Sequence, residues 1–406
     1  MNWENVPLRK LITPNTKRNR PDLPLLSVVR DKGIIKRNLD RSDNHNVIPE
    51  DLSNYKVVST GQFVINKMKA WQGSCGVSPY DGIVSPAYFV FDLNIDNPRF
   101  FNYSIRSRAF IAEFNRLSKG IRVDQWDLEL DKLKYVRFPL PPRDEQDQIV
   151  RYLDWKVSGI NRLINAKRRQ IVLLQEQKQA VINEAVTKGS EGWRPSYIKR
   201  EFINLDYMRR PVEASVRSQK GEVLYDYYGA SGVVDKIDDY IFDQTTLLIA
   251  EDGANLVLRN LPLIYIAKGK YWVNNHAHIL VPNEYNDMMF MAYLLESIDY
   301  TVYITGAAQP KLSQNNLGRV PLCVPTLAEQ QEIATHLDTQ CARINKVIEA
   351  LNEEIALFAE YRTRLISDVV TGKLDVRGVV VPEFEAVEDM AEDNKDTEEM
   401  EDTDDI

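Results

Sequence analysis

The chain repeats itself at an offset of 184 residues, and this duplication constrains its fold more than any other feature. Residues 136–187 align without a gap to residues 320–371, with 17 identities in 52 positions. A match sustained at one fixed offset indicates an internal duplication. The segments that precede the two repeats, 1–130 and 189–310, resemble each other only faintly. The sequence therefore predicts a variable domain, a helix, a second variable domain, a second helix and a tail.

Each repeat is predicted to be one long helix. The repeats begin after prolines, at Pro141-Pro142 and at Pro325, and neither contains an internal proline. Apolar residues recur at alternating steps of four and three, which is the spacing of a coiled-coil seam. Gly189 and Gly372 stand where the helices should end. The predicted seam consists of Leu153, Val157, Ile160, Ile164, Lys167, Ile171, Leu174, Lys178, Val181 and Ala185 in the first repeat, and of Leu337, Cys341, Ile344, Ile348, Leu351, Ile355, Phe358, Arg362, Leu365 and Val369 in the second.

A stripe of this length normally packs against another helix, so we expect the two repeats to form an antiparallel coiled coil. Such a pair relates the two halves of the chain by an approximate two-fold axis. The alternative is that each helix packs only on its own domain. The predicted fold is α+β, with two globular domains joined by the two helices. The parts are a first variable domain (1–140), a first helix (141–188), a second variable domain (189–322), a second helix (323–375) and an acidic disordered tail (376–406).

Charge is distributed unevenly along the chain. The whole chain has a net charge of −8, but Pro382–Ile406 holds 13 acidic residues and one lysine, so the rest is +4. Residues 1–140 are net +7, which suits a nucleic-acid partner, whereas residues 189–322 are net −3. The sequence contains neither an apolar run of 18 residues nor a secretory signal, and its three cysteines are far apart. These features favour a cytoplasmic protein that does not associate with membranes.

The first variable domain contains short runs typical of strands, at 57–66 and 82–91. Between them lies a loop, 67–76, that contains two lysines, a tryptophan and several amide or hydroxyl groups. Such side chains can hold phosphates and touch base edges. The alternative is an ordinary exposed polar loop.

The second variable domain contains four glycine-rich or amide-rich strings. They are Tyr227-Tyr228-Gly229-Ala230-Ser231-Gly232, Ile249-Ala250-Glu251-Asp252-Gly253-Ala254-Asn255-Leu256, Trp272-Val273-Asn274-Asn275-His276-Ala277-His278-Ile279-Leu280 and Gly306-Ala307-Ala308-Gln309-Pro310-Lys311-Leu312-Ser313. Asn and Gln can pair with adenine, and Arg or Lys with guanine. Glycine lets the backbone approach a ligand closely.

Together these features resemble the specificity subunits of type I restriction–modification systems, over nearly the whole chain. The resemblance rests on the tandem plan, the Pro-x-x-x-Glu-Gln start of both helices, the strings of the second domain, and Gly-x-x-Gln-x-x-Leu before the second helix. The first domain departs from the pattern. It has Lys119-Gly120-Ile121-Arg122 in place of the last string and lacks Glu-Asp-Gly-Ala-Asn, which fits divergence toward a different half-site.

The resemblance implies that each variable domain reads one half of a bipartite double-stranded DNA target. It implies that the helices fix the gap and dock two methyltransferase subunits, which two restriction subunits can join. S-adenosylmethionine, ATP and magnesium would serve those partners, and this chain would hold no cofactor, metal or catalytic residue. The candidate DNA-contacting residues are Lys67, Lys69, Trp71, Gln72, Ser74 and Arg122 in the first domain, and Asn255, Arg259, Asn274, Asn275, His276, Gln309 and Lys311 in the second.

Other functions have weaker support. Asn97-Pro98-Arg99-Phe100 differs from the methyltransferase loop (Asn/Asp)-Pro-Pro-(Tyr/Phe), and we interpret it as a turn. His276 and His278 would face one side of a strand, but no third His or Cys is near, so hydrogen-bonded or DNA-facing histidines are favoured over a metal site. The sequence has no P-loop, and a pure coiled-coil scaffold would leave the two domains without a role. A stand-alone DNA-binding regulator remains the alternative.

Overall fold

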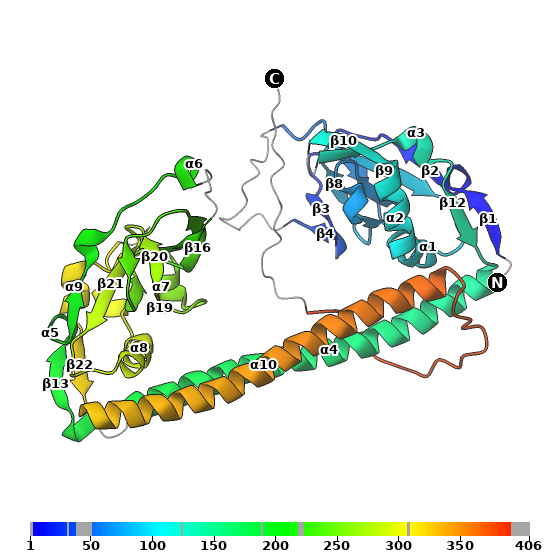
Figure 1. Ribbon diagram of the computed structural model, residues 1–406. Coiled ribbons are helices and arrows are strands. Elements are labelled where there is room, and N and C mark those ends of the chain that lie inside the picture. Colours follow the sequence, from blue (N-terminus) through cyan, green and yellow to red (C-terminus); the bar gives the residue numbers. More distant parts are fainter. Residues whose placement is uncertain are drawn as a thin grey trace. The chain divides into compact units, whose positions relative to one another are not determined.

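In the computed structural model, the chain divides into two compact units, Met1–Arg169 with Leu351–Ile406, and Gln170–Ala350. The structure describes residues 3–30, 32–37, 51–122, 125–187, 190–217, 223–306 and 309–390. Each unit contains one globular domain of strands and short helices, and two long helices pass through both units (Figure 1). The predicted α+β fold, with two domains joined by paired helices, is confirmed. In the described part of the chain, no helix combines the length and the apolar character that a membrane span needs.

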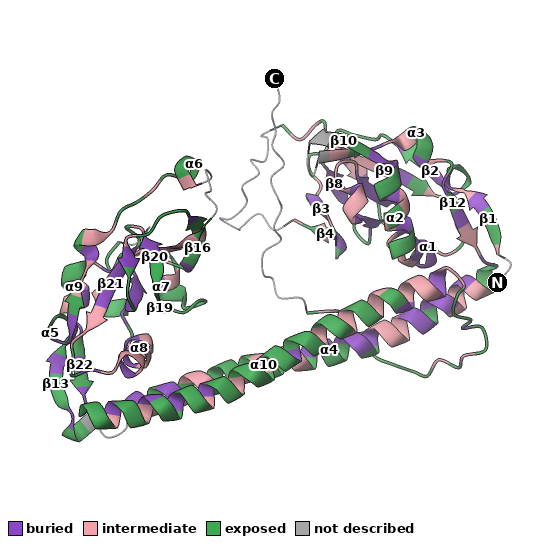
Figure 2. Ribbon diagram, in the orientation of Figure 1, coloured by how far each residue is buried: buried purple, intermediate pink, exposed green. Residues whose placement is uncertain are grey.

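The two long helices are α4, Arg143–Thr187, and α10, Leu327–Val370. They pair antiparallel, because in the first unit the start of α4 packs with the end of α10, and in the second unit the end of α4 packs with the start of α10. The shared cores contain Ile160, Ile164, Leu365 and Val369 in the first unit, and Ile182, Val186, Leu337 and Cys341 in the second. Every predicted seam residue is buried or half-buried, and the stripe is visible along both helices (Figure 2). Gly372 follows α10 with φ +74°, as a helix-ending glycine should.

Three polar residues interrupt the apolar seam, and each has a partner across it. Lys167 pairs with Glu354, Arg362 donates to the Asn161 side chain, and Lys178 Nζ donates to Asn345 Oδ1 at 3.0 Å. Polar pairs inside a helical seam favour one register over its neighbours. These pairs therefore help to set how the two helices align.

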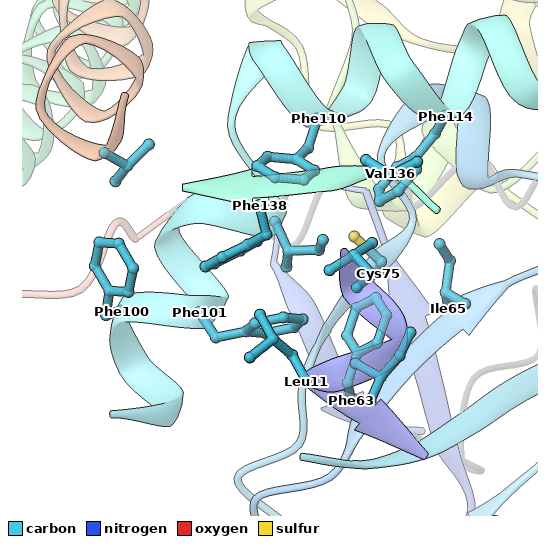
Figure 3. Close-up of a cluster of buried hydrophobic side chains, with 14 of the residues drawn as sticks. Leu11, Phe63, Ile65, Cys75, Phe100, Phe101, Phe110, Phe114, Val136 and Phe138 are labelled. Atoms are coloured by element: carbon cyan, nitrogen blue, oxygen red, sulfur yellow. The ribbon is translucent and has the colours of Figure 1, made fainter. Parts of the chain in front are cut away.

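The first domain is built around a four-stranded antiparallel sheet of order β2-β9-β6-β7. Phe63 of this sheet packs with Phe100, Phe101 and Phe138 in the main core (Figure 3). The elements of this domain are β1 Glu4–Pro7, η1 Leu8–Lys10, β2 Ile12–Asn15, β3 Leu26–Val29, β4 Gly33–Lys36, β5 Lys56–Val58, β6 Phe63–Asn66, η2 Ala70–Gln72, β7 Cys75–Val77, β8 Gly82–Val84, β9 Tyr88–Leu93, α1 Pro98–Ile105, α2 Arg108–Leu117, β10 Ser118–Arg122, β11 Gln125–Leu128, α3 Leu130–Leu133 and β12 Arg137–Leu140.

The second domain contains a four-stranded antiparallel sheet of order β14-β21-β18-β19, which repeats the strand order of the first. A second sheet, β16-β15-β20-β17, includes one parallel pair, β15 with β20. The elements are η3 Ser190–Gly192, β13 Arg194–Tyr197, α5 Ile198–Glu201, β14 Phe202–Asn204, η4 Asp206–Met208, α6 Ala214–Arg217, β15 Tyr225–Gly229, β16 Gly232–Ile237, β17 Phe242–Asp243, β18 Thr246–Ala250, α7 Asn255–Leu258, β19 Ile264–Ala267, β20 Lys270–Val273, β21 Ala277–Pro282, α8 Met288–Ser297, η5 Thr301–Tyr303, α9 Gln314–Gly318 and β22 Pro321–Val324.

In each domain, an equivalent hydrogen bond from a tyrosine to an aspartate connects the domain to its long helix. Tyr103 of α1 donates its hydroxyl to Asp154 at 2.9 Å, and Tyr293 of α8 donates to Asp338 at 2.7 Å. Asp154 and Asp338 occupy equivalent positions of the 184-residue repeat. The positions that are identical in the two repeats therefore include the aspartates to which each domain binds its helix.

The glutamine of each Pro-x-x-x-Glu-Gln motif secures the start of its helix. The Gln146 amide donates to the carbonyl of Pro141 at 2.9 Å, and the Gln330 amide donates to the carbonyl of Pro325 at 3.0 Å. Both glutamines are 1% exposed. A buried amide needs a partner, so each glutamine is tied to the turn that precedes its helix.

The segment Asn97-Pro98-Arg99-Phe100 starts a helix, so its interpretation as a simple turn is wrong. Asn97 is the N-cap of α1, and its side-chain oxygen accepts from the backbone N–H groups of Arg99 and Phe100. Its amide nitrogen donates to Asp147 of α4 at 2.6 Å. Asparagine before a proline at the first helical position is a favourable cap, which explains the motif without catalysis.

The segment after α10 is also ordered further than expected. Residues 376–390 lie along α4 in the first unit, whereas a disordered tail is predicted to begin at 376. Gln148 donates to the carbonyl of Val379 at 2.7 Å, and Asn161 and Asn165 each donate at 2.9 Å to backbone carbonyls of this segment. We call residues 376–390 the strap. The rest of the predicted tail, 391–406, lies outside the described residues.

Candidate nucleic-acid interface

In the second domain, the four predicted strings meet at one edge of the β14-β21-β18-β19 sheet. Strands β18 and β21 are antiparallel, so the end of β18 and the start of β21 lie at the same edge. Beyond that edge, Glu251 N donates to the carbonyl of His276 at 2.9 Å, and Gly253 N donates to the carbonyl of Pro310 at 3.1 Å. Asn274 N donates to Tyr228 O at 3.0 Å. Backbone hydrogen bonds thus join segments that are far apart in the sequence into one surface.

Four of the predicted DNA-contacting side chains are exposed on this surface: Asn275, His276, Gln309 and Lys311. Within the described residues, the side chains of Asn275 and Gln309 have no hydrogen-bond partner. His276 Nδ1 lies 2.7 Å from Asp252, and Lys311 Nζ lies 3.1 Å from Glu251. We call these four residues the recognition set. The amides of this set and the imidazole of His276 are suited to base edges, and the ammonium group of Lys311 is suited to phosphates.

The other three candidates in this domain already have structural partners. Asn255 accepts from Leu261 N at 2.8 Å and donates to Leu261 O at 3.0 Å, which closes the loop after α7. Arg259, with φ +54°, donates to the carbonyl of Glu296 at 2.5 Å, at the end of α8. The side-chain oxygen of Asn274 accepts from His276 N at 2.8 Å. These residues shape the loops, and a direct contact between them and DNA stays a prediction.

His276 and His278 do not share a face, contrary to the expectation from their spacing. β21 begins at Ala277, so His276 lies in the preceding turn and is exposed, whereas His278 is completely buried. His278 Nδ1 lies 2.6 Å from Asp206, and its Nε2 lies 2.7 Å from the carbonyl of Leu312. The physical reason is that the period-two rule applies only within a strand.

Asp206, Glu251 and His278 offer ligand atoms within 4.8 Å of one another, which is a spacing that could hold a metal ion. Their contacts favour a different interpretation. Both ring nitrogens of His278 already have partners, and the guanidinium of Arg209 bonds to Glu251. A fixed cation, the guanidinium of Arg209, is therefore already part of this group. We call Asp206, Arg209, Glu251 and His278 the buried ionic cluster.

Both acids of the buried ionic cluster are ionised at neutral pH. Burial alone would raise the pKa of Asp206, but the hydrogen bond and positive charge of His278, with Arg209 nearby, hold it below its ordinary value. Burial likewise opposes ionisation of Glu251, yet bonds from Arg209 and Lys311 and the charge of His278 lower its pKa. Sequence analysis missed Arg209, because the residue lies outside all four strings.

In the first domain, the predicted loop follows β6, which occupies the place in its sheet that β18 has in the second domain. The structure packs this loop against the β10–β11 hairpin. Lys67 pairs with Asp127, and Leu128 N donates to the carbonyl of Lys67 at 3.0 Å. The Trp71 ring lies on the Trp126 ring with centroids 5.0 Å apart. Both segments singled out in the first domain, the 67–76 loop and residues 119–122, thus come together.

The remaining candidates of the first domain differ in exposure. Ser74 is 3% exposed, so its hydroxyl is covered and we no longer assign it to the surface. Lys69 and Gln72 lie in or beside η2, and both are half-exposed. The side chain of Arg122 lies outside the described part of the molecule, so its role stays a prediction. Asn66, 3% exposed, accepts from Met68 N at 3.0 Å and builds the loop from below, a role that the sequence does not reveal.

Comparisons with known proteins agree with this picture. Residues 196–357 match the family model described as the type I restriction modification DNA specificity domain. A Haemophilus influenzae protein named as the type I restriction enzyme specificity subunit S.HindORF215P is 32% identical over 160 residues, which span 39% of this chain and 40% of that protein's length. A Methanocaldococcus jannaschii protein named as the MjaX specificity subunit is 22% identical over 358 residues, 81% of each chain.

The fold has a counterpart among solved structures. A chain from a structure concerned with complex assembly and conformational transition of the type I R-M system superposes with a TM-score of 0.65. It covers 92% of this chain and 98% of that chain at 15% identity. At that identity the likeness concerns the fold alone. The resemblance expected from the sequence motifs is confirmed by the family model and by the similar sequences.

Proposed function

We propose, taking this chain as a specificity subunit of a type I restriction–modification system, that each of its two domains reads one half of a bipartite DNA target. The observation that carries the proposal is the repeated position of the candidate loops. The loop after β6 and the loop after β18 follow equivalent strands of two sheets with the same strand order. Both loops present polar side chains, yet their residues differ. Two similar scaffolds with different loops suit two different half-sites.

The long helices suit the role of a spacer. A 45-residue helix such as α4 is about 68 Å long at about 1.5 Å per residue. Half-sites on adjacent turns of one DNA face lie about 34–36 Å apart. Under this proposal the helix pair, rather than a flexible linker, would connect the two domains and so fix the gap between two unlike half-sites.

The chain itself would act as the recognition subunit, and its partners would carry the chemistry. Two methyltransferase subunits would dock on the helices, with S-adenosylmethionine bound to them, and two restriction subunits would add ATP- and magnesium-dependent cleavage. The exposed polar faces of α4 and α10 away from the seam support such docking. The recognition set and the loop after β6 would contact the DNA.

Co-purification of the full-length tagged chain from its own host, followed by mass spectrometry, tests the proposal. We expect two methyltransferase copies per chain, and a methylated bipartite sequence in the genome of the host. A matched strain without this gene should lack that methylation. A chain that purifies alone, or with DNA only, would contradict the proposed assembly and favour a stand-alone DNA-binding regulator.

A further inference from the structure

We propose that His278 and Arg209 are positioning residues for DNA recognition by the second domain, acting through the loops that they hold and not through contact with DNA. This inference rests on the proposed function, because it concerns how the DNA-reading surface keeps its shape. The fully buried His278 and the 17% exposed side chain of Arg209 lie beneath the recognition set. Neither group can reach a phosphate or a base from that position.

Both ring nitrogens of His278 have an oxygen partner. Nε2 lies 2.7 Å from the carbonyl of Leu312, and Nδ1 lies 2.6 Å from Asp206. The other oxygen of Asp206 accepts from Ile279 N at 2.8 Å. A buried imidazole that is held at both nitrogens has a fixed orientation, so His278 connects these two groups.

These two bonds join three separate segments of the domain. Asp206 belongs to η4, His278 to β21, and Leu312 to the segment that carries Gln309 and Lys311. Leu312 N also donates to the carbonyl of Glu251 at 2.7 Å. Through His278, the segment of Gln309 and Lys311 is thus fixed to the strand that follows Asn275 and His276.

Arg209 provides a second set of links to the same loops. Besides its bond to Glu251, its guanidinium donates to the carbonyls of Ala277 at 3.1 Å and Asn275 at 3.4 Å. Glu251 in turn receives Lys311 at 3.1 Å. A carboxylate buried beneath a DNA-binding surface would repel phosphates if it were uncompensated. The cluster therefore both fixes the loops and removes that repulsion.

Two substitutions at His278 separate its bonds. In H278N the amide nitrogen stands near the place of Nδ1 and keeps the link to Asp206, whereas in H278Q it stands near the place of Nε2 and keeps the link to Leu312. A third variant, R209K, keeps the charge but has no counterpart of the Nε–H group that donates to the carbonyl of Asp206 at 3.1 Å, so it cannot bond to Asp206 and Glu251 through two separate nitrogens. The matched control is I203V, because Ile203 is 55% exposed on β14, away from the recognition set and from the long helices. Each variant is prepared as the full chain in its purified complex.

The measurement is selection of bound duplexes from a random DNA library, with affinities determined over a range of salt concentrations. We expect wild type and I203V to select the same bipartite sequence. For H278N, H278Q and R209K we expect about tenfold or greater loss of affinity for that sequence, with preference lost only in the half read by the second domain. The slope of log affinity against log salt should stay unchanged, since no phosphate contact is removed.

The possible outcomes distinguish a failure of the proposed function from a failure of the positioning role. If the wild-type complex selects no sequence, the proposed function fails. If it selects one, and the three variants keep its affinity and preference in both halves, only the positioning role is wrong. Thermal denaturation of each variant distinguishes a displaced loop from an unfolded domain. A variant that loses preference in both halves, or that has a smaller salt slope, would also contradict the positioning role.

Discussion

At the scale of single residues, the proposed function requires a domain with net negative charge to bind DNA, and local charge pairing makes this feasible. Three acids contact the recognition set or the residues that hold it: Asp206, Glu251 and Asp252. Each has a cationic or imidazole partner: His278 for Asp206, Arg209 and Lys311 for Glu251, and His276 for Asp252. Total charge is therefore a poor guide to this surface, since local pairing decides what a phosphate meets.

Reversing the charge of Lys69 should weaken binding to all duplexes about equally. Lys69 lies at the start of η2 in the loop after β6, and a lysine that contacts phosphate contributes about one released counterion. We expect the slope of log affinity against log salt to become shallower by about 1 in K69E. The same substitution at Lys132, which pairs with Glu129 on α3, is the control and should leave the slope unchanged. An unchanged slope in K69E would remove this loop from the interface.

Removing either tyrosine hydroxyl that donates to a long helix should destabilise the chain. Tyr103 and Tyr293 each donate to an aspartate of a long helix. We expect Y103F and Y293F each to lower the free energy of unfolding by about 1 kcal/mol, because each removes a hydrogen bond between a partly buried hydroxyl and a helix carboxylate. Urea denaturation measures this, with Y135F as control, since Tyr135 is 58% exposed. Equal stability of all three variants would contradict the role assigned to these bonds.

The same tyrosines give stability a defined pH dependence. Burial, and the neighbouring aspartate, raise the pKa of both hydroxyls above the unfolded value of about 10. Their contribution is fully present below pH of about 10 and is lost as the pH rises above it, because only the unfolded chain then releases the proton readily. Stability of wild type should fall more steeply above pH 10 than that of a Y103F/Y293F double variant. Parallel curves would contradict this.

At the scale of elements, the long helices could be predicted from the sequence and the strap could not. Proline starts, a heptad stripe and terminal glycines are local signals. The predicted bounds lie within two residues of the observed ends of α4, and within five residues of the observed ends of α10. The end of the strap belongs to the stretch Pro382–Ile406, whose 13 acidic residues and one lysine are typical of a disordered segment. The order of the strap comes from contacts with Asn161, Asn165 and Gln148 of α4, which composition does not reveal.

The candidate site could also be predicted only in part. Glycine and amide strings indicated four segments of the second domain, because turn residues are visible in a sequence. The sequence does not indicate a role for Arg209, because this residue lies 42 residues before its partner Glu251. The equivalence of the loops after β6 and β18 was hidden as well, since the two loops share a position in the fold but hardly any residues.

Removing the strap should destabilise the first unit, whereas removing only the end of the chain should not. Val376 is 2% exposed in the main core of this unit, and Asp389 pairs with both Arg168 and Arg362. A chain ending at Asp375 should therefore melt several degrees lower than wild type. A chain ending at Met390 keeps all described contacts and is the control. Equal melting temperatures for the two truncated chains would show that the strap contributes nothing.

At the scale of the whole molecule, the duplication gives the chain two domains and two paired helices, and under the proposed function each domain would read one half-site. The repeated residues belong to the helix seam and include Asp154 and Asp338, which accept the tyrosine hydrogen bonds. The loops after β6 and β18 differ in sequence. Each domain with its half of the helix pair also has its own hydrophobic core. Modules of this kind should be exchangeable without loss of the other half's specificity.

Exchange of residues 1–140 for the corresponding domain of another specificity subunit tests this central claim most directly. The purified hybrid complex and the wild-type complex would each select duplexes from one random library, and the bound sequences would be compared half by half. The account predicts a new sequence in one half, with the other half and the length of the gap unchanged. A hybrid whose target changes in both halves, or does not change at all, would contradict the assignment of one half-site to each domain.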